Sequence, residues 1–220
     1  MSHVNGSLPI GVPKVKFSVR AHLLPPLIGI VASLAVYGLL NYPLVVTKAN
    51  YYLNQFSRPS QTAAVAPGVI IDKNSTQVKI PSIGVQAPVI YDSSIKENDI
   101  IYNLRSGVVH YSTTALPGEK GNVVIFGHSS GVAWAKGDYK YVFALLEKLR
   151  TGQQISLDYQ GTRYIYVVTG SKVVAPTEVD VLNNTSSSQL SLITCTPVGT
   201  SKNRLVVQAK QIVPKPPATD

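Results

Sequence analysis

Residues 189–209 read QLSLITCTPVGTSKNRLVVQA, two strand-like runs around a loop. The run Gln189–Thr194 alternates apolar and polar residues, and Leu205–Ala209 is again rich in branched apolar residues, as is typical of β-strands. A proline and a glycine interrupt the pattern between the two runs. A loop of this length can return the chain antiparallel. The sequence therefore predicts a hairpin with Cys195 where the first strand ends and Arg204 where the second begins.

The chain upstream of this hairpin, from Gln77 on, shows the same kind of pattern. Gln160-Gly161 is typical of a tight hairpin turn. Between Val142 and Leu149, apolar residues instead recur at i, i+3, i+4 and i+7, which predicts a helix. Many short strands with one or two short helices predict a mostly β fold, a closed or nearly closed β-barrel, although a sandwich has a similar pattern. The other expected strands are Gln77–Ile80, Val85–Tyr91, Gly107–Tyr111, Asn122–Phe126, Gln154–Tyr159 and Thr162–Val168.

The composition narrows the class of protein. In 220 residues, 20 Lys+Arg against 11 Asp+Glu give a net charge of +9, and a hydrophobic fraction of 45% argues against a disordered chain. The single cysteine excludes an internal disulfide and a zinc site built on cysteines. The basic residues are spread out, so an anionic surface such as a membrane or cell wall fits them as well as nucleic acid does. No acidic cluster has the spacing of metal ligands, and we expect neither a metal nor a cofactor.

The N-terminal region contains an apolar run long enough to cross a membrane. Leu27–Val46 holds 20 residues without a charge, whereas a buried core helix rarely avoids charge for so long and a cleaved signal peptide usually has a shorter apolar core. The basic residues before the run predict a cytoplasmic N-terminus and an extracytoplasmic body. We therefore divide the chain into a cytoplasmic segment, a membrane anchor, a linker, the β-rich body and a polar tail: 1–22, 23–47, 48–76, 77–212 and 213–220.

Cys195 is the first candidate for catalysis. A lone cysteine is more often a small buried hydrophobe, but this one stands where a strand meets a loop. A thiol nucleophile needs a base. The predicted topology removes His3 and His22. Of the other two histidines, His128 follows a strand directly and is favoured, whereas His110 lies inside a strand and fits a structural hydrogen bond better.

Arg204 is the candidate for charge stabilisation. The predicted hairpin brings it back beside Cys195, nine positions earlier in the chain. A guanidinium is always charged and has five directed donors, which suit a developing oxyanion. The alternative is an ordinary solvated surface arginine.

These residues resemble a known family. Leu192–Pro197, followed by Arg204, resembles the Cys/Arg signature of sortases. Ala115–His128 resembles their histidine motif, and the preceding pair His110-Tyr111 is also typical of the family. Ile80–Val89 is similar to their early strands. The resemblance covers nearly the whole predicted body, and it implies a closed sortase-type β-barrel for the catalytic domain.

The resemblance implies a cysteine transpeptidase with His128, Cys195 and Arg204 as catalytic residues. The thiolate would attack the Thr carbonyl of a Leu-Pro-x-Thr-Gly-like sorting signal in a secreted protein. The resulting thioester would pass to an amine of a cell-wall precursor or a pilin lysine. Candidate substrate contacts are Thr194, Thr196 and Val198, although Thr194 fits strand packing equally well.

These motifs define the sortase subclass less clearly than they define the family. Many relatives have Arg where Ser129 stands and an aromatic residue where Val198 stands. A single predicted anchor favours a single-anchor sortase, with classes D and E among the candidates. Two other functions stay open: a membrane-tethered cysteine hydrolase that releases its acyl group to water, and a non-catalytic surface β-domain.

Overall fold

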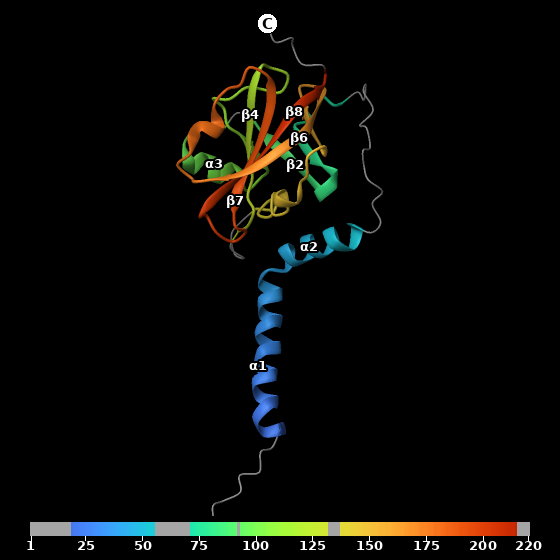
Figure 1. Cartoon of the computed structure of the whole chain (residues 1–220), viewed down its shortest axis with the longest axis vertical. Helices are drawn as coiled ribbons and strands as arrows, with labels where there is room; N and C mark the ends of the chain where they lie inside the picture. Colours follow the sequence, from blue (N-terminus) through green and yellow to red (C-terminus); the bar gives the residue numbers. More distant parts are fainter. Residues whose placement is uncertain (1–18, 56–70, 92, 132–136, 215–220) are drawn as a thin grey trace, which may run out of the picture. The chain divides into compact units, whose positions relative to one another are not determined.

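The computed structural model describes residues 19–55, 71–91, 93–131 and 137–214. They belong to two compact units, one ending at Asn41 and the other beginning at Tyr42. Figure 1 shows the helices and the β-barrel of the two units.

The first unit contains one helix, α1 (Val19–Leu40). Its segment Leu23–Leu40 is long and apolar enough to cross a membrane, and none of it is buried against protein. The predicted anchor, residues 23–47, covers this segment and also the first residues of the next helix. Pro43 has no N–H to continue the helical hydrogen bonds, so the helical run is interrupted at Asn41. The next helix, α2 (Tyr42–Gln55), belongs to the second unit and occupies the start of the predicted linker.

The second unit is a closed β-barrel of eight strands, which confirms the predicted barrel and excludes the sandwich (Figure 1). The ring order is β1-β2-β3-β4-β7-β8-β6-β5, and every predicted strand is present. Gln160 and Gly161 have φ values of 47° and 78°, as the tight turn between β5 and β6 requires. The strands are β1 (Gln77–Ile80), β2 (Val85–Ile90), β3 (Val108–His110), β4 (Gly121–Phe126), β5 (Gln154–Tyr159), β6 (Thr162–Val174), β7 (Ser188–Thr196) and β8 (Asn203–Val213).

Side chains fill the barrel interior, as expected for a barrel of eight strands. Tyr166 of β6 and Leu192 of β7 are among the largest fully buried side chains. Leu145, Leu146 and Leu149 join this core, but their segment consists of turns and the short 3-10 helix η2 (Leu146–Lys148), not the predicted α-helix. The helical spacing of these leucines arises because one side of the segment is buried. Successive turns can bury one side as well as an α-helix can.

One short helix was missed by the sequence analysis. Helix α3 (Glu97–Asn103) has no buried residue, so it leaves no apolar periodicity to read. The 3-10 helices η1 (Pro81–Ile83) and η3 (Val179–Leu182) complete the body.

A second apolar cluster lies on the outer face of the barrel. Its floor is formed by Val124 of β4, Ile193 of β7 and Val206 of β8, which alternate with inward-facing core residues. Val181 and Leu182 of η3 pack against this floor from the loop between β6 and β7. We call these residues the outer cluster. It holds η3 against the outer face of three adjacent strands.

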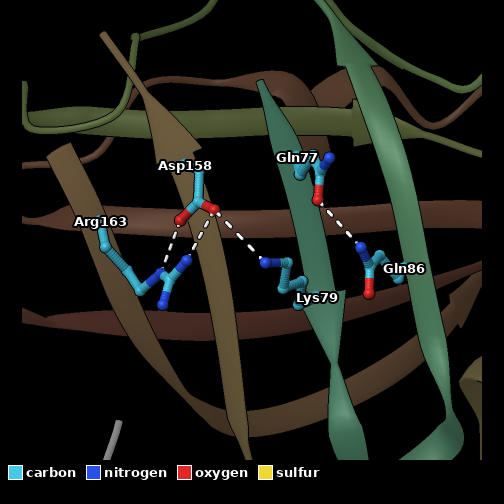
Figure 2. Close-up of polar contacts among 5 residues, drawn as sticks. All are labelled: Gln77, Lys79, Gln86, Asp158 and Arg163. Carbon is cyan, nitrogen blue, oxygen red and sulfur yellow. Dashed lines mark hydrogen bonds and ion pairs between the residues drawn. The ribbon is translucent and has the colours of Figure 1, made fainter. Parts of the chain in front are cut away.

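A buried carboxylate bridges the strand pair that closes the barrel. Asp158 of β5 is 1% exposed, and its two oxygens accept hydrogen bonds from Nε and Nη2 of Arg163 on β6, at 2.6 and 2.8 Å (Figure 2). Lys79 of β1 lies 3.7 Å from the same carboxylate. The hydrogen bond to Asp158 is the main cause that raises the pKa of Arg163. Beside them, Gln86 donates to the side chain of Gln77 at 3.1 Å and ties β2 to β1.

Candidate active site

Cys195 and Arg204 lie opposite each other in the antiparallel pair β7–β8. Directly opposed residues of such a pair have Cβ atoms roughly 5 Å apart and share a face of the sheet. Both side chains are half-buried. Gly199, with φ of 91°, lies in the loop that reverses the chain between them. The predicted hairpin is thus present, with the two residues in register.

His128 lies level with Cys195, just past the end of the other neighbouring strand. Strands β4 and β7 run parallel with Phe126 beside Ile193. The pairing continues past the strand end, because the Gly127 N–H donates to the Ile193 carbonyl at 3.1 Å. Two residues beyond Phe126 and Ile193, the same register sets His128 beside Cys195, and adjacent strands lie about 4.8 Å apart.

Alternation shows that the three side chains project to the same side of the sheet. Gly127 faces the interior, since a Cβ there would lie 2.4 Å from the ring of Phe143. His128, the next residue, therefore points outward. Cys195 and Arg204 each lie two residues from a member of the outer cluster and share its face. The thiol stands on the middle strand, with the imidazole on one flank and the guanidinium on the other.

Burial favours the neutral form of the imidazole. Loss of solvent around the ring lowers the pKa of His128 from its usual value near 6.5. The ring is therefore largely unprotonated at neutral pH and can accept a proton. Phe143 holds the backbone at this position, because its N–H donates to the His128 carbonyl at 2.9 Å.

The guanidinium of Arg204 is anchored on one side only. Its Nη1 donates to the carbonyls of Ser201 and Asn203, at 3.1 and 3.2 Å. Within the described part of the chain, Nε and Nη2 have no hydrogen-bond partner. These donors are thus available to an oxygen that develops charge near Cys195.

Thr194 connects the nucleophile strand to the histidine strand. It is 4% exposed, and its hydroxyl donates to the Gly127 carbonyl at 2.7 Å. This placement agrees with the strand-packing alternative for Thr194, and its contact with a substrate stays a prediction. Of the other predicted contact residues, Thr196 pairs with Asn203 at the end of β7, and Val198 is half-buried in the β7–β8 loop.

The loops around the site are linked to each other. The Gly199 N–H donates to the Ser130 hydroxyl at 3.1 Å, and the Tyr141 hydroxyl donates to the Gly131 carbonyl at 3.2 Å. Ser129, which the sequence marks only as a departure from relatives, is 1% exposed, and its hydroxyl has no hydrogen-bond partner among the described residues. Tyr139, in the loop after His128, is half-buried against the barrel core.

His110 occupies a different place from His128. It is 1% exposed within β3, and its Nε2 lies 2.9 Å from the Ala115 carbonyl and 3.2 Å from the Thr114 hydroxyl. Its ring also contacts Tyr91, with ring centres 5.3 Å apart. These contacts fit the structural role that its position inside a strand suggests.

The described residues hold no group of three or more His, Cys, Asp or Glu side chains that could bind a metal ion. The register of β4, β7 and β8 offers a nucleophile and acid–base arrangement: a thiol, an imidazole whose pKa is lowered by burial, and a guanidinium. Such a set supports acyl transfer through a covalent thioester.

Known proteins share this domain. The family model for the sortase domain matches residues 78–212. Sortase A of Bacillus anthracis is 30% identical over 131 residues, which cover 60% of this chain and 56% of that protein. Sortase D of Bacillus subtilis is 25% identical over 210 residues, covering 85% of this chain and 97% of that protein.

Solved structures agree with the sequence comparisons. Sortase C-1 from Actinomyces oris matches with a TM-score of 0.54 and 28% identity, covering 70% of this chain and 83% of that one. A sortase D5 transpeptidase from Clostridium perfringens matches with a TM-score of 0.52 and 25% identity, covering 74% of this chain and 94% of that one. With the family model spanning more than half of its length, the chain belongs to the sortase family.

Proposed function

We propose that this protein is a membrane-anchored cysteine transpeptidase in which Cys195 is the nucleophile, His128 the acid–base group and Arg204 the oxyanion stabiliser. The observation that carries the proposal is the shared outer face of β4, β7 and β8, where the register puts the thiol between the other two groups. Family membership supports the reaction class.

The first half of the reaction forms a thioester. Neutral His128 accepts the proton of the Cys195 thiol, and the thiolate attacks the carbonyl carbon of the scissile peptide bond. The carbonyl oxygen gains negative charge and accepts hydrogen bonds from the partnerless donors of Arg204. The tetrahedral intermediate then breaks its C–N bond, and the imidazolium of His128 gives its proton to the leaving amine.

The second half transfers the acyl group. An incoming primary amine attacks the thioester carbonyl and loses a proton to His128. The C–S bond breaks, and the Cys195 sulfur regains a proton from the imidazolium. The same three side chains therefore serve both halves, and the product is a new amide bond.

The substrate is a secreted protein with a Leu-Pro-x-Thr-Gly-like sorting signal, and the acceptor is an amine of a cell-wall precursor or a pilin lysine. Family membership supports this class of substrate and acceptor. Helix α1 supports a membrane anchor, with a cytoplasmic N-terminus and an extracytoplasmic barrel. Anchoring would hold enzyme, substrate and acceptor on one surface and raise their effective concentrations.

The test is a product analysis with the full chain in detergent. A sorting-signal peptide is incubated with increasing amounts of an oligoglycine amine, and the products are identified by mass spectrometry. We expect cleavage between Thr and Gly and an amide product that increases with the amine. Products that stay hydrolytic at high amine would instead show a cysteine hydrolase. Equal turnover by the Cys195→Ala variant would contradict the assignment of the nucleophile.

A further inference from the structure

Helix α2 carries an apolar stripe that the barrel does not cover. Tyr42, Val45, Tyr52 and Leu53 are 63%, 47%, 51% and 72% exposed. With 3.6 residues per turn, these positions and the exposed Ala49 fall on one side of the helix. We call these five residues the α2 stripe. Four of them keep roughly half or more of their surface in contact with solvent.

The opposite side of α2 faces the barrel. Tyr51 packs against the barrel core as a half-buried side chain. Pro43 and Thr47 line a cavity of about 260 Å³, together with Val85 of β2 and Tyr139 of the loop after His128. The helix is therefore fixed to the barrel by one face, which leaves the α2 stripe on the other.

The composition of α2 suits a lipid surface. The helix has no acidic residue, and Lys48 is its one charged residue. Tyrosines at positions 42 and 52 combine an apolar ring with a hydroxyl, a chemistry favoured where a membrane meets water. Near Tyr52, the described residues also place the basic side chain of Lys148. That ammonium also pairs with Glu147 at 3.4 Å, so the exposed apolar residues of α2 carry the argument.

The short connection between α1 and α2 indicates that the membrane, rather than another protein, covers the α2 stripe. Asn41 alone separates α1 from α2, and one residue spans at most about 3.6 Å. If α1 crosses the bilayer, the first turn of α2 must begin at the headgroup layer. A second copy or a partner protein would have to displace lipid there.

We infer that α2 is an interfacial helix whose stripe lies in the headgroup region of the anchoring membrane and thereby fixes one side of the barrel toward the bilayer. This inference rests on the proposed membrane anchor, but not on the proposed chemistry. Interfacial helices bury their apolar face about 5–10 Å into the boundary between headgroups and acyl chains.

The test measures the depth of single labels on the full chain. Because Cys195 is the only cysteine, the Cys195→Ala background accepts one new cysteine at a time, labelled with a nitroxide. Positions Val45, Ala49 and Tyr52 sample the stripe, and exposed Asn50 is the matched control on the edge of the same helix. The chain is placed in vesicles of phosphatidylcholine and phosphatidylglycerol, and collisions with dissolved oxygen and a water-soluble nickel chelate are recorded.

We expect oxygen collisions to exceed nickel collisions at the stripe, with the reverse order at Asn50. A further label at Ala35 of α1 reports the anchor itself. A deep Ala35 label with stripe labels in water would overturn this inference alone, whereas a water-exposed Ala35 label would overturn the anchor as well. Stripe labels protected from both reagents would overturn it in favour of a protein contact. Spin–spin broadening that disappears on dilution with unlabelled chain would identify that contact as a second copy.

Discussion

The hydroxyl of Thr194 donates to the carbonyl of Gly127 at 2.7 Å, so the residue before the candidate nucleophile holds the residue before the candidate base. Both groups are buried, and the bond crosses between β4 and β7 where their pairing ends. The relative placement of Cys195 and His128 therefore depends on a contact that neither of them makes.

Thr194→Val should keep the shape of this side chain but remove the bond. A buried carbonyl without its donor costs about 1–3 kcal/mol, and we expect the exits of β4 and β7 to shift relative to each other. The kcat should fall about ten- to a hundredfold, since small misplacements of reacting groups are costly, while KM changes little. Thr194→Ser restores the donor and should recover most of kcat. Equal kcat for the Val and Ser variants would contradict this positioning role.

Arg204→Lys should retain a positive charge but lose the directed donors. We expect kcat/KM to fall about a hundredfold, the usual effect of removing an oxyanion donor. Arg150→Lys is the matched control, because its guanidinium donates to the backbone carbonyls of Glu147 and Leu149 near η2. Steady-state kinetics with a sorting peptide should show little change for that control. Wild-type kinetics for Arg204→Lys would remove Arg204 from the mechanism.

His128→Gln should lower activity, whereas His110→Gln should lower stability. Loss of the proton acceptor at position 128 should lower kcat about 10²–10⁴-fold, as for other general acid–base groups. His110→Gln should mainly lower thermal stability, because that ring is buried and hydrogen-bonded inside β3. Activity is measured at a temperature where both variants are folded. If His110→Gln abolished turnover while His128→Gln did not, the two roles would be exchanged.

The pH dependence of His128 has a definite sign. Burial lowers its folded-state pKa, so the unfolded chain takes up its proton first as the pH falls. This group therefore adds no pH dependence above its ordinary pKa near 6.5, and it lowers the free energy of unfolding as the pH drops below that value. His128→Gln should flatten that part of a urea stability profile. The acidic limb of kcat/KM should likewise have its midpoint below pH 6.5, and a midpoint clearly above it would refute a neutral resting imidazole.

Asp158→Asn should destabilise the barrel without direct effect on the chemistry. It removes the negative partner of Arg163 and Lys79, whose side chains are 19% and 33% exposed. We expect a loss of about 2 kcal/mol in urea unfolding, less than for a fully buried pair because both cations retain some solvent. Glu178→Gln is the control, since its pair with Lys172 is well exposed and should contribute little. An unchanged urea midpoint for Asp158→Asn would show that the contacts of Asp158 with Arg163 and Lys79 do not contribute to stability.

The local parts of this site were readable from the sequence. Alternation before Cys195 and after Arg204, with a proline and a glycine between, predicts a hairpin, and the register then follows from the loop length. All eight strands were predicted for the same reason: each has its own pattern of branched and aromatic residues. The shared face of the thiol and guanidinium is a local property of this kind.

Contacts between distant segments could not be read in this way. Gly127 and Thr194 are far apart in the chain, and no pattern states that β4 pairs with β7 in parallel. The burial of the Ser129 hydroxyl without a partner among the described residues could not be predicted from the sequence either, because this burial depends on the surrounding loops. The spacing between Val142 and Leu149 correctly marks a buried side but not the backbone shape that buries it.

The order of the strands has a consequence for biosynthesis. The histidine strand β4 leaves the ribosome well before β7 and β8, yet its side chain meets the sulfur only once those two late strands have inserted beside it. A nascent or partly translocated polypeptide therefore holds an unassisted thiol. On the proposed mechanism, the thiol therefore gains its base only when the last strands of the barrel are in place.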